Sequence, residues 1–359
     1  MKHLVFFHLF NDYSGSPKIL KTVIQNLLDR NFRIDLVTSR GGILDKLKIS
    51  SNLKRYSYRY HFSPHPVLTI IRYLGVQIYT FFFAFRYILD KDVVFYINTL
   101  LPTGPALAGK LMGKRIIYHY HENAFAKGIF YKVLAGIMQE LADEIICVSS
   151  YQASFLKKKR HVIIIPNALP ETFINQLHPC PGKAFKQKEI LMIGSLKLYK
   201  GTLEFFELAG RLPQFHFTLV INDTQSHINK FITEYKLKIR NNLSIYPRQE
   251  KVSSFYNRAS IVLNLSNKSL FIETFGLTAL EAMYAGLPVI VPTVGGIAEL
   301  VEDNMNGYKI DVQNLDAIEK KIMEILTNNQ LYQKLAENAL SASKKYNERK
   351  MIDTIVSQL

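Results

Sequence analysis

The chain has 359 residues, of which 48% are hydrophobic and 21% charged, and this composition excludes disordered, collagen-like and low-complexity classes. A chain of this length exceeds what one hydrophobic core usually organises, so two domains are expected. The two cysteines, Cys147 and Cys180, lack the spacing of metal ligands or of a disulfide scaffold, which fits a reducing compartment. We therefore expect a cytoplasmic protein.

The net charge of +16 is unevenly distributed. Residues 1–170 hold 23 Lys and Arg against 10 Asp and Glu, a net +13, whereas residues 171–359 hold 22 against 19, a net +3. A basic surface attracts anionic lipid or nucleic acid, but neither zinc-finger spacing nor an RNP-type aromatic motif is present, so no nucleic acid is expected. Peripheral contact with the anionic inner face of the cell membrane is favoured, and a merely basic solvated surface is the alternative.

In chain order, apolar strand-like runs alternate with amphipathic helical patterns, which is typical of βαβ units and a parallel sheet. Residues 1–168 predict one doubly wound, N-terminal acceptor-side domain. Its first apolar run lacks a cleavage site and predicts a strand rather than a signal peptide. A helix is expected over 18–30, and strands are expected at 4–9, 34–38, 93–98, 116–119, 145–148 and 162–165.

The most membrane-like stretch covers residues 67–89. Arg72 and Arg86 interrupt it and leave an uncharged run over 73–85, which falls short of the roughly 20 residues that a spanning helix needs. We expect that it does not span. Aromatic side chains between arginines fit a helix in the plane of the lipid headgroups, and a buried core helix explains the apolar part about equally well.

Residues 169–188 are rich in proline and predict a linker. A second α/β domain is expected over 189–340, followed by a C-terminal helix at 341–359 that can cross back to the first domain. Ligands of open α/β sheets bind at the carboxyl ends of the strands, so we expect the chemistry in a cleft that both domains face. The second domain should hold helices at 201–212 and 277–285 and strands at 190–193, 217–221, 244–246, 261–265, 288–291 and 308–310.

Two glutamates in the second half bracket the start of a helix. Glu273 lies in the preceding loop and Glu281 on the helix itself. Phe275, Gly276 and Leu277 stand at the helix N-terminus, where unpaired backbone N–H groups and the helix dipole favour an anion such as a diphosphate. From charge spacing alone, an ordinary turn with two solvated glutamates is the more frequent explanation.

The pattern Glu-x7-Glu with Phe-Gly-Leu inside it, continued by Glu-Ala-Met-x-x-Gly-x-Pro-Val, resembles glycosyltransferase family 4. The resemblance covers nearly the whole chain and implies the GT-B fold, with two Rossmann-like doubly wound parallel-sheet domains facing a central cleft. It implies a retaining transferase that moves a sugar from a UDP- or GDP-linked donor to a lipid-linked or glycan acceptor. The setting would be bacterial capsule or lipopolysaccharide synthesis. Glu273 would contact the donor sugar, and Glu281 the ribose hydroxyls.

Further positions match the family in the expected order. Gly194 and Ser195, followed by Lys197 and Lys200, resemble the Gly-Arg…Lys-Gly element that grips the donor diphosphate. The resemblance assigns Lys200 to the phosphate and the leaving group. The family's usual arginine is absent at Ser195, so Lys197 or a residue from elsewhere has to supply the second positive charge.

The first half carries two further matches. Gly15 and Ser16 follow the first strand and resemble the family's glycine-rich loop, near the donor phosphates and the acceptor. His121, with His119 as the second choice, resembles the strand-end histidine that approaches the transferred sugar. Without the resemblance, Gly15 and Ser16 would be explained as an ordinary βα loop, and His119 and His121 as structural histidines.

No metal and no cofactor besides the nucleotide-sugar substrate is expected. Asp90 and Asp92 form an Asp-x-Asp triplet, but their place in a charged turn favours solvated side chains over a metal site. No covalent nucleophile is assigned, because in this family the departing phosphate is thought to take the acceptor proton on the same face.

Two other functions remain open on the same scaffold. One is a different GT-B enzyme, such as a nucleotide-sugar epimerase or a phosphorylase, because a fold does not fix a function. The other is an inactive, membrane-binding partner subunit. The absence of the family's arginine at Ser195 favours this alternative. Lys200, Glu273 and Glu281 together favour the transferase.

Overall fold

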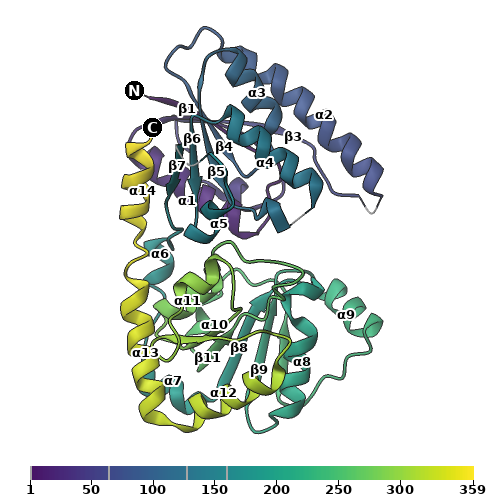
Figure 1. Ribbon diagram of the computed structural model, residues 1–359, viewed down its shortest axis with the longest axis vertical. Helices are drawn as coiled ribbons and strands as arrows, with labels where there is room; N and C mark the ends of the chain where they lie inside the picture. The colour runs from purple at the N-terminus through teal and green to yellow at the C-terminus, as the bar shows by residue number, and fades with distance from the viewer. Residues whose placement is uncertain (1, 64, 127, 159–160) are drawn as a thin grey trace. The chain divides into compact units, whose positions relative to one another are not determined.

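The computed structural model of the protein describes residues 2–63, 65–126, 128–158 and 161–359. The chain divides into two compact units, Met1–Pro166 with Arg349–Leu359, and Asn167–Glu348 (Figure 1). The segment expected as a linker carries two short helices of the second unit, α6 (Glu171–Ile174) and α7 (Pro181–Gln187). The expected C-terminal helix is divided between the end of α13 (Asn329–Ser343) and α14 (Glu348–Ser357), and nearly all of α14 belongs to the first unit.

The first unit is built on a parallel sheet in which the described strands run in the order β3-β2-β1-β4-β5-β6-β7. Strand β1 pairs with β2 on one side and with β4 on the other, so the order reverses there, as in doubly wound folds. The strands are β1 (His3–His8), β2 (Arg33–Ser39), β3 (Leu53–Tyr58), β4 (Val94–Asn98), β5 (Arg115–Tyr120), β6 (Glu144–Cys147) and β7 (Val162–Ile164).

Helices cover both faces of this sheet because alternate strand residues are buried on opposite sides. Val5 and Phe7 belong to a core cluster shared with α2 (Pro66–Ala84), α3 (Thr103–Leu111), α4 (Ile129–Leu141) and α5 (Ser150–Ser154). The opposite face carries α1 (Gly15–Asp29), whose C-terminal Arg30 pairs with Asp353 of α14 at 2.6 Å (Figure 1). Short 3-10 turns complete the unit: η1 (Ile43–Lys46), η2 (Phe85–Tyr87) and η3 (Ala124–Ala126).

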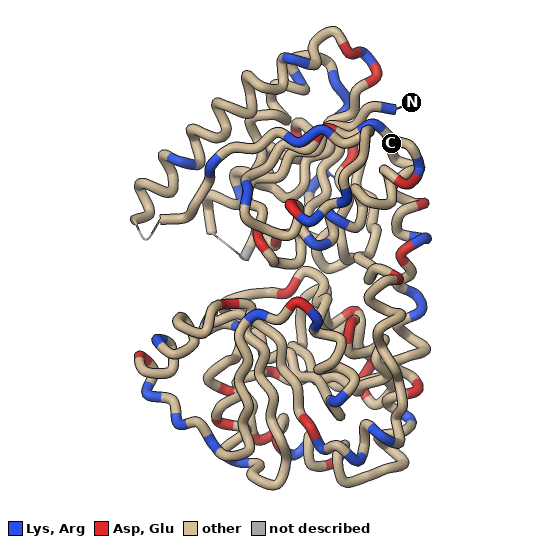
Figure 2. The backbone as a smooth tube through the Cα atoms, turned by 180° about the vertical axis from the view of Figure 1, so that it is seen from behind, with Lys and Arg blue, Asp and Glu red and all other residues tan. Residues whose placement is uncertain are grey.

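Helix α2 is longer and more apolar than the uncharged run at 73–85 suggested. By length and composition alone, Pro66–Tyr87 could cross a membrane, with a mean hydropathy of 1.5. One side of α2 is nevertheless built into the unit, because the side chain of Gln77 accepts a hydrogen bond from the backbone N–H of Gly104 at 2.9 Å. Without a side chain on Gly104, α3 can approach the α2 backbone closely. The other side of α2 is exposed. Figure 2 shows that the helix as a whole carries few charged residues along its length.

The second unit repeats the doubly wound pattern. Its described strands run in the order β10-β9-β8-β11-β12-β13, with the reversal at β8. The strands are β8 (Glu189–Gly194), β9 (His216–Ile221), β10 (Leu243–Tyr246), β11 (Ile261–Leu263), β12 (Val289–Val291) and β13 (Gly307–Lys309). The helices and turns besides α6, α7 and α13 are η5 (Leu198–Lys200), α8 (Thr202–Arg211), α9 (Gln225–Glu234), α10 (Ser253–Tyr256), α11 (Leu277–Tyr284), η6 (Gly296–Leu300) and α12 (Leu315–Thr327).

One loop at the carboxyl edge of the second sheet requires glycine. Gly276 precedes α11 with a φ of 94°, in the left-handed region that L-residues avoid. A Cβ atom there would lie 2.4 Å from Cγ1 of Ile297, inside van der Waals contact. The turn into α11 therefore needs both the backbone freedom and the small size of glycine.

Gly276→Ala is expected to destabilise the second unit by about 2 to 4 kcal/mol, because the free-energy cost of backbone strain is added to that of a clash in the core. The matched control is Gly75→Ala on α2, where a Cβ meets nothing within 4 Å and alanine favours the helix by up to ~1 kcal/mol. Urea unfolding of both variants measures the difference. Equal stability of the Gly276→Ala and wild-type proteins would contradict this account of the loop.

Candidate active site

An ion pair lies at the carboxyl edge of the second sheet. Nζ of Lys200, at the end of η5, is 2.5 Å from Oε1 of Glu273, although the two residues are 73 positions apart in the sequence. Oγ of Ser266 donates a second hydrogen bond to the same carboxylate oxygen at 3.0 Å. Burial raises the pKa of Glu273, but the charge of Lys200 and these hydrogen bonds outweigh burial and hold that pKa below its usual value. Glu273 is therefore a charged carboxylate at neutral pH.

Two aromatic rings support the lysine. The ammonium group of Lys200 lies 4.1 Å from the centroid of the Phe271 ring, and Phe271 stacks on Tyr199 at 4.7 Å. A cation over an aromatic face is stabilised by the ring quadrupole. Contacts from the carboxylate and the ring therefore fix the position of this charge.

The loop between Glu273 and α11 is held by its backbone. The N–H of Gly296 in η6 donates to the carbonyl of Glu273 at 2.8 Å, and the amides of Ala279 and Leu280 bond to the carbonyl of Gly276. Phe275 is buried against Tyr346 at a centroid distance of 5.7 Å, so its side chain anchors the loop. The backbone N–H groups at the start of α11, around Leu277, can bind an anion.

Glu281 lies one turn further along α11. The hydroxyl of Tyr256 donates a 2.5 Å hydrogen bond to Oε2 of Glu281. Burial raises the pKa of Tyr256, so its hydroxyl stays protonated and acts as the donor. The tyrosine therefore fixes the direction in which this carboxylate points.

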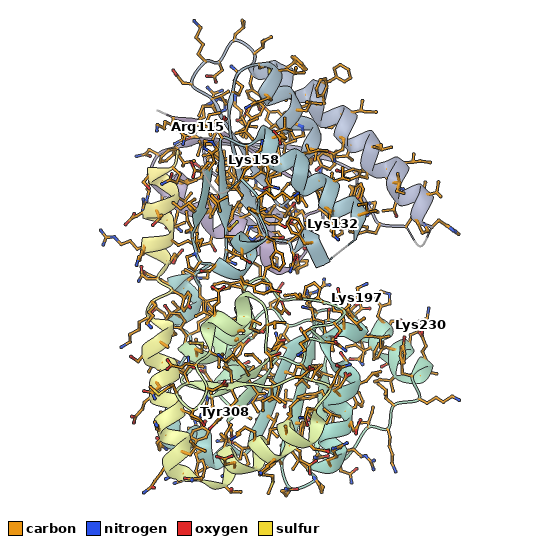
Figure 3. The ribbon with its side chains drawn as sticks, viewed as in Figure 1. Arg115, Lys132, Lys158, Lys197, Lys230 and Tyr308 are labelled. Carbon is orange, nitrogen blue, oxygen red and sulfur yellow. The ribbon has the colours of Figure 1, made fainter. Side chains whose placement is uncertain are left out.

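The segment after β8 carries the remaining predicted donor-site residues. Gly194 ends the strand, and the carbonyl of Ser195 accepts a hydrogen bond from Thr202 at the start of α8. Lys197 is exposed on the same loop (Figure 3). The structure thus brings Lys200 to Glu273 and leaves the Lys197 side chain in solvent.

The carboxyl edge of the first sheet carries a cluster of histidines. Oδ1 of Asn98, the last residue of β4, lies 3.2 Å from Nε2 of His121, and its Nδ2 lies 3.0 Å from Nδ1 of His8. The rings of His119 and His121 lie 4.1 Å apart. His119 is fully buried against the Tyr96 hydroxyl at 2.8 Å, whereas His121 is partly exposed. Of the two histidines, His121 is the one that a ligand can reach.

Burial keeps these imidazoles uncharged. It lowers the pKa of His8 to about 4 and that of His119 to about 3, and it lowers the pKa of His121 well below its usual value. Neighbouring histidines lower the pKa of His121 further, because two adjacent imidazolium ions would repel each other. All three rings are therefore neutral at pH 7.

Gly15 and Ser16 form the first turn of α1, at the same edge of the first sheet. Asp12 organises the entry to this helix, since its Oδ1 accepts hydrogen bonds from the N–H and the hydroxyl of Ser14 at 2.9 and 2.6 Å. Backbone N–H groups of a first helical turn can bind phosphate or hydroxyl oxygens.

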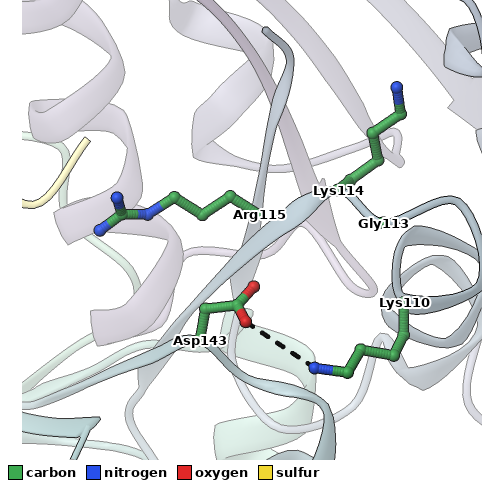
Figure 4. A pocket seen from close by; sticks show the side chains of 5 residues that line it. All are labelled: Lys110, Gly113, Lys114, Arg115 and Asp143. Atoms are coloured by element: carbon green, nitrogen blue, oxygen red, sulfur yellow. Dashed lines mark ion pairs between the residues drawn. The ribbon is translucent and has the colours of Figure 1, made fainter. Parts of the chain in front are cut away.

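No group of three His, Cys, Asp or Glu side chains among the described residues is placed to hold a metal ion. Asp90, from the predicted Asp-x-Asp turn, bonds instead to Nδ1 of His3 at 2.7 Å. A hollow of about 530 Å³ lies near the start of β5, lined by Lys110, Lys114 and Arg115 (Figure 4). These three side chains point in different directions, and Lys110 pairs with Asp143, so the hollow lacks converging ligand-binding groups.

Four residues of the site were not predicted from the sequence: Tyr256, Ser266, Asn98 and His8. Each is a polar residue within or next to an apolar strand or short helix, and no charge pattern distinguishes it. Asn98 and His8 could have been identified by position, because each is the last residue of its strand and ligands of parallel sheets bind at that end.

Two units with doubly wound parallel sheets define the GT-B class of fold. The family model of "Glycosyltransferase Family 4" matches residues 13–172, and that of "Glycosyl transferases group 1" matches residues 174–342. The chain therefore belongs to the GT-B glycosyltransferases of family 4. This membership confirms the family and the fold class that the Glu-x7-Glu segment predicts.

Known relatives agree with this assignment. An uncharacterised glycosyltransferase of Methanocaldococcus jannaschii is 30% identical over 59% of this chain and 57% of its own length. The lipopolysaccharide glucosyltransferase WaaG of Escherichia coli is 26% identical over 61% of this chain and 60% of its own. The chain thus spans under two thirds of either relative. The structure of HepE of Anabaena with UDP and glucose shares the fold, with a TM-score of 0.79, 17% identity and coverage of 100% and 99%.

Proposed function

We propose that the protein is a retaining glycosyltransferase that moves a sugar from a UDP- or GDP-linked donor to a lipid-linked or glycan acceptor during cell-surface polysaccharide synthesis. The observation that carries the proposal is the Lys200–Glu273 ion pair beside the N-terminus of α11. Two relatives support the substrate classes, since one is named a lipopolysaccharide glucosyltransferase and another is seen with UDP and glucose.

In this reaction negative charge builds on the diphosphate as the bond to the sugar breaks. Lys200 and the backbone N–H groups at the start of α11 stabilise that charge in a partly buried setting, where electrostatic interactions are strong. Glu273 accepts hydrogen bonds from hydroxyls of the donor sugar, and Glu281, oriented by Tyr256, accepts from the ribose hydroxyls. The departing phosphate takes the acceptor proton on the same face, so the proposal needs neither a protein nucleophile nor a metal.

The first unit contributes His121, Gly15 and Ser16 under this proposal. His121 contacts the transferred sugar as a neutral imidazole, because burial keeps its pKa low. The first turn of α1 supplies N–H groups near the phosphates and the acceptor.

We also propose that the protein is cytoplasmic and acts at the inner face of the cell membrane, through α2. Its exposed side carries an apolar stripe at helical spacing: Ile71, Leu74, Ile78 and Phe82, which are 59%, 51%, 60% and 68% exposed. Leu107 and Leu111 of α3 and Ile129 and Val133 of α4 are exposed as well. An apolar surface of this extent is unusual on a protein that meets only water.

The charges around these helices suit an anionic surface. Helices α2 and α3 contain no Asp or Glu, while Arg72 on α2 and Lys110 on α3 are exposed. Lys132 on α4 is exposed as well (Figure 3). The packed side of α2, fixed through Gln77 and Gly104, argues for a helix that lies in the headgroup plane rather than one that crosses the bilayer.

A nucleotide-release assay tests the proposed reaction. The protein is supplied with a panel of UDP- and GDP-sugars, with and without lipid-linked acceptors, and the anomeric configuration of any product is determined. A product that keeps the donor's configuration is expected. Epimerised donor, phosphate-dependent release of sugar phosphate, or no turnover with any pair would contradict the proposal and indicate an epimerase, a phosphorylase or an inactive subunit, respectively.

Lys200→Ala is expected to lower kcat by at least ~100-fold, because the departing diphosphate loses its cation. The same change leaves Glu273 partly buried without its partner and should cost about 1 to 3 kcal/mol of stability. Adding Glu273→Gln should restore stability but not activity, which separates the two effects in a double-mutant cycle. A Lys200→Ala protein with normal kcat would contradict the phosphate role.

Glu281→Ala is expected to weaken nucleotide binding by about 1.5 to 3 kcal/mol, because charge-assisted hydrogen bonds to the ribose are lost. Tyr256→Phe keeps the ring and removes only the hydroxyl, so a smaller loss of roughly 1 kcal/mol is expected. Calorimetric titration with nucleoside diphosphates measures both, and Tyr308→Phe in β13 serves as a tyrosine control. Unchanged affinity of the Glu281→Ala protein would refute the ribose contact.

Replacing Leu74, Ile78 and Phe82 by serine should weaken binding to anionic vesicles at least tenfold, because each buried apolar side chain adds roughly 1.5 kcal/mol or more. Phe81 and Phe83, unlike Phe82, pack partly buried against the core and are left intact. Binding of the wild-type protein should also fall steeply with salt.

Co-sedimentation with phosphatidylserine vesicles beside a thermal melt measures this binding. Ile239→Ser, at an exposed isoleucine of the second unit, is the matched control. A folded triple variant that pellets like wild type would show that α2 is not the membrane contact.

A further inference from the structure

Strand β3 forms one edge of the first sheet and belongs to a basic segment of the chain. Residues 46–89 hold seven Lys and Arg residues and no Asp or Glu. Successive residues of a strand point to opposite faces of the sheet. The ring of Tyr56 lies 5.0 Å from that of Phe83 on α2, so Arg55 and Ser57 project from the face of β3 that is turned away from α2.

A hollow of about 250 Å³ is lined by residues of β2, β3 and η1. Arg40, Arg55 and Ser57 are among the lining residues. Nε of Arg40 donates a 2.6 Å hydrogen bond to Oγ of Ser57, and Ser57 follows Arg55 by two residues, roughly 7 Å along the strand. The guanidinium groups of both arginines therefore lie beside the same hollow.

Neither guanidinium group forms an ion pair within the described part of the chain. Arg55 donates to two backbone carbonyls at η1, which hold its side chain in place. Arg40 uses only its Nε atom, so its two Nη groups have no acceptor among the described residues. Asp45 lines the hollow as well, but its carboxylate already accepts hydrogen bonds from the backbone N–H of Gly41 and the side-chain amide of Asn11.

The donors around the hollow suit a phosphate group. A guanidinium binds two oxygens of one phosphate through parallel N–H donors, and a phosphate monoester offers three acceptor oxygens. Ser57 accepts a hydrogen bond from Arg40 and keeps its own proton for a further oxygen. A carboxylate has only two oxygens, so donors from three side chains favour phosphate over carboxylate.

We propose that Arg40, Arg55 and Ser57 bind a phosphate group on the acceptor. This inference rests on the proposed function, in which Lys200 holds the donor diphosphate, so a phosphate site in the first unit belongs to the other substrate. The site lies at the carboxyl ends of β2 and β3, where ligands of parallel sheets bind. Two strand spacings, roughly 10 Å, separate β3 from β1, so the phosphate is carried at a distance from the reacting hydroxyl.

A phosphate of the glycan part of the acceptor fits this site better than a headgroup of the bilayer. The proposed membrane helix α2 packs against the opposite face of β3, whereas Arg55 and Ser57 project away from it. The site therefore recognises the acceptor and is separate from the membrane contact.

Inorganic phosphate is the probe for the site itself. Nε–Hε signals of ¹⁵N-arginine-labelled protein are assigned from Arg40→Gln and Arg55→Lys and followed as phosphate is added at constant ionic strength. The signals of Arg40 and Arg55 should shift along one saturation curve, and acetate should shift them far less. Read from the Arg55 signal, Arg40→Gln should weaken phosphate binding about tenfold, because charge-assisted hydrogen bonds are lost.

Arg349→Gln is the matched control, because it removes the same charge from a side chain on α14 that is 84% exposed. Its phosphate affinity should stay within about twofold of wild type, since an exposed charge far from the hollow contributes little. The absence of a saturable shift, equal binding of acetate, or an equal loss of affinity in Arg349→Gln would overturn the site.

Transfer assays with a glycan acceptor that carries a phosphate monoester, before and after phosphatase treatment, test the role of the site. Removing the phosphate should raise KM at least ~tenfold, and Arg40→Gln should raise KM for the phosphorylated acceptor alone, with kcat nearly unchanged. Equal KM values for the two acceptors would overturn the acceptor role. Saturation of the Arg55 shift by a single-stranded oligonucleotide at far lower concentration than phosphate would also overturn it, in favour of nucleic acid. If the wild-type protein transfers no sugar, the proposed function fails, and the phosphate titration still decides whether the site exists.

Discussion

A carboxylate that is largely shielded from water stays charged only when a cation or several hydrogen-bond donors accompany it. Glu273 has both, since Lys200 and Ser266 converge on one of its oxygens. The pair joins η5 to the loop before α11, and the Phe271 ring limits where the lysine can move. A charged group held in this way is ready to act on an anion, because its position needs no reorganisation when charge develops nearby. The phosphate and sugar roles proposed for the second unit both depend on this contact.

Sheet topology explains why distant residues meet at these sites. In both units the strand order reverses at the first strand, and the loops that follow the strands gather at the carboxyl edge. At this edge the second unit places Lys200, Glu273 and the start of α11, and the first unit places His8, Asn98 and His121. The two edges differ in chemistry. One holds fixed charges suited to a diphosphate, and the other holds neutral imidazoles suited to hydroxyl groups.

The sequence predicts the fold class well because most buried strands read as short apolar runs, and the family resemblance agrees. It misses β3, an edge strand whose residues Leu53–Tyr58 include Lys54, Arg55 and Ser57 and so form no apolar run. The predicted linker at 169–188 contains helices, since proline begins α7 rather than excluding it. Among site residues, Glu273, Glu281 and Lys200 belong to local sequence motifs. Tyr256 and Asn98 join the site only through contacts with residues distant in the sequence, which no local pattern encodes. Phe81, Phe82 and Phe83 look alike in sequence, and only their helical positions decide which one is exposed.

The central claim is that Lys200, Glu273 and Glu281 together hold a nucleoside diphosphate. A crystal structure of the protein soaked with UDP or GDP tests it most directly. A diphosphate oxygen is expected within hydrogen-bond distance of Nζ of Lys200 and of the first N–H groups of α11, with the ribose hydroxyls on Glu281. A nucleotide bound elsewhere, with the Lys200–Glu273 pair untouched and Glu281 away from the ribose, would contradict these roles.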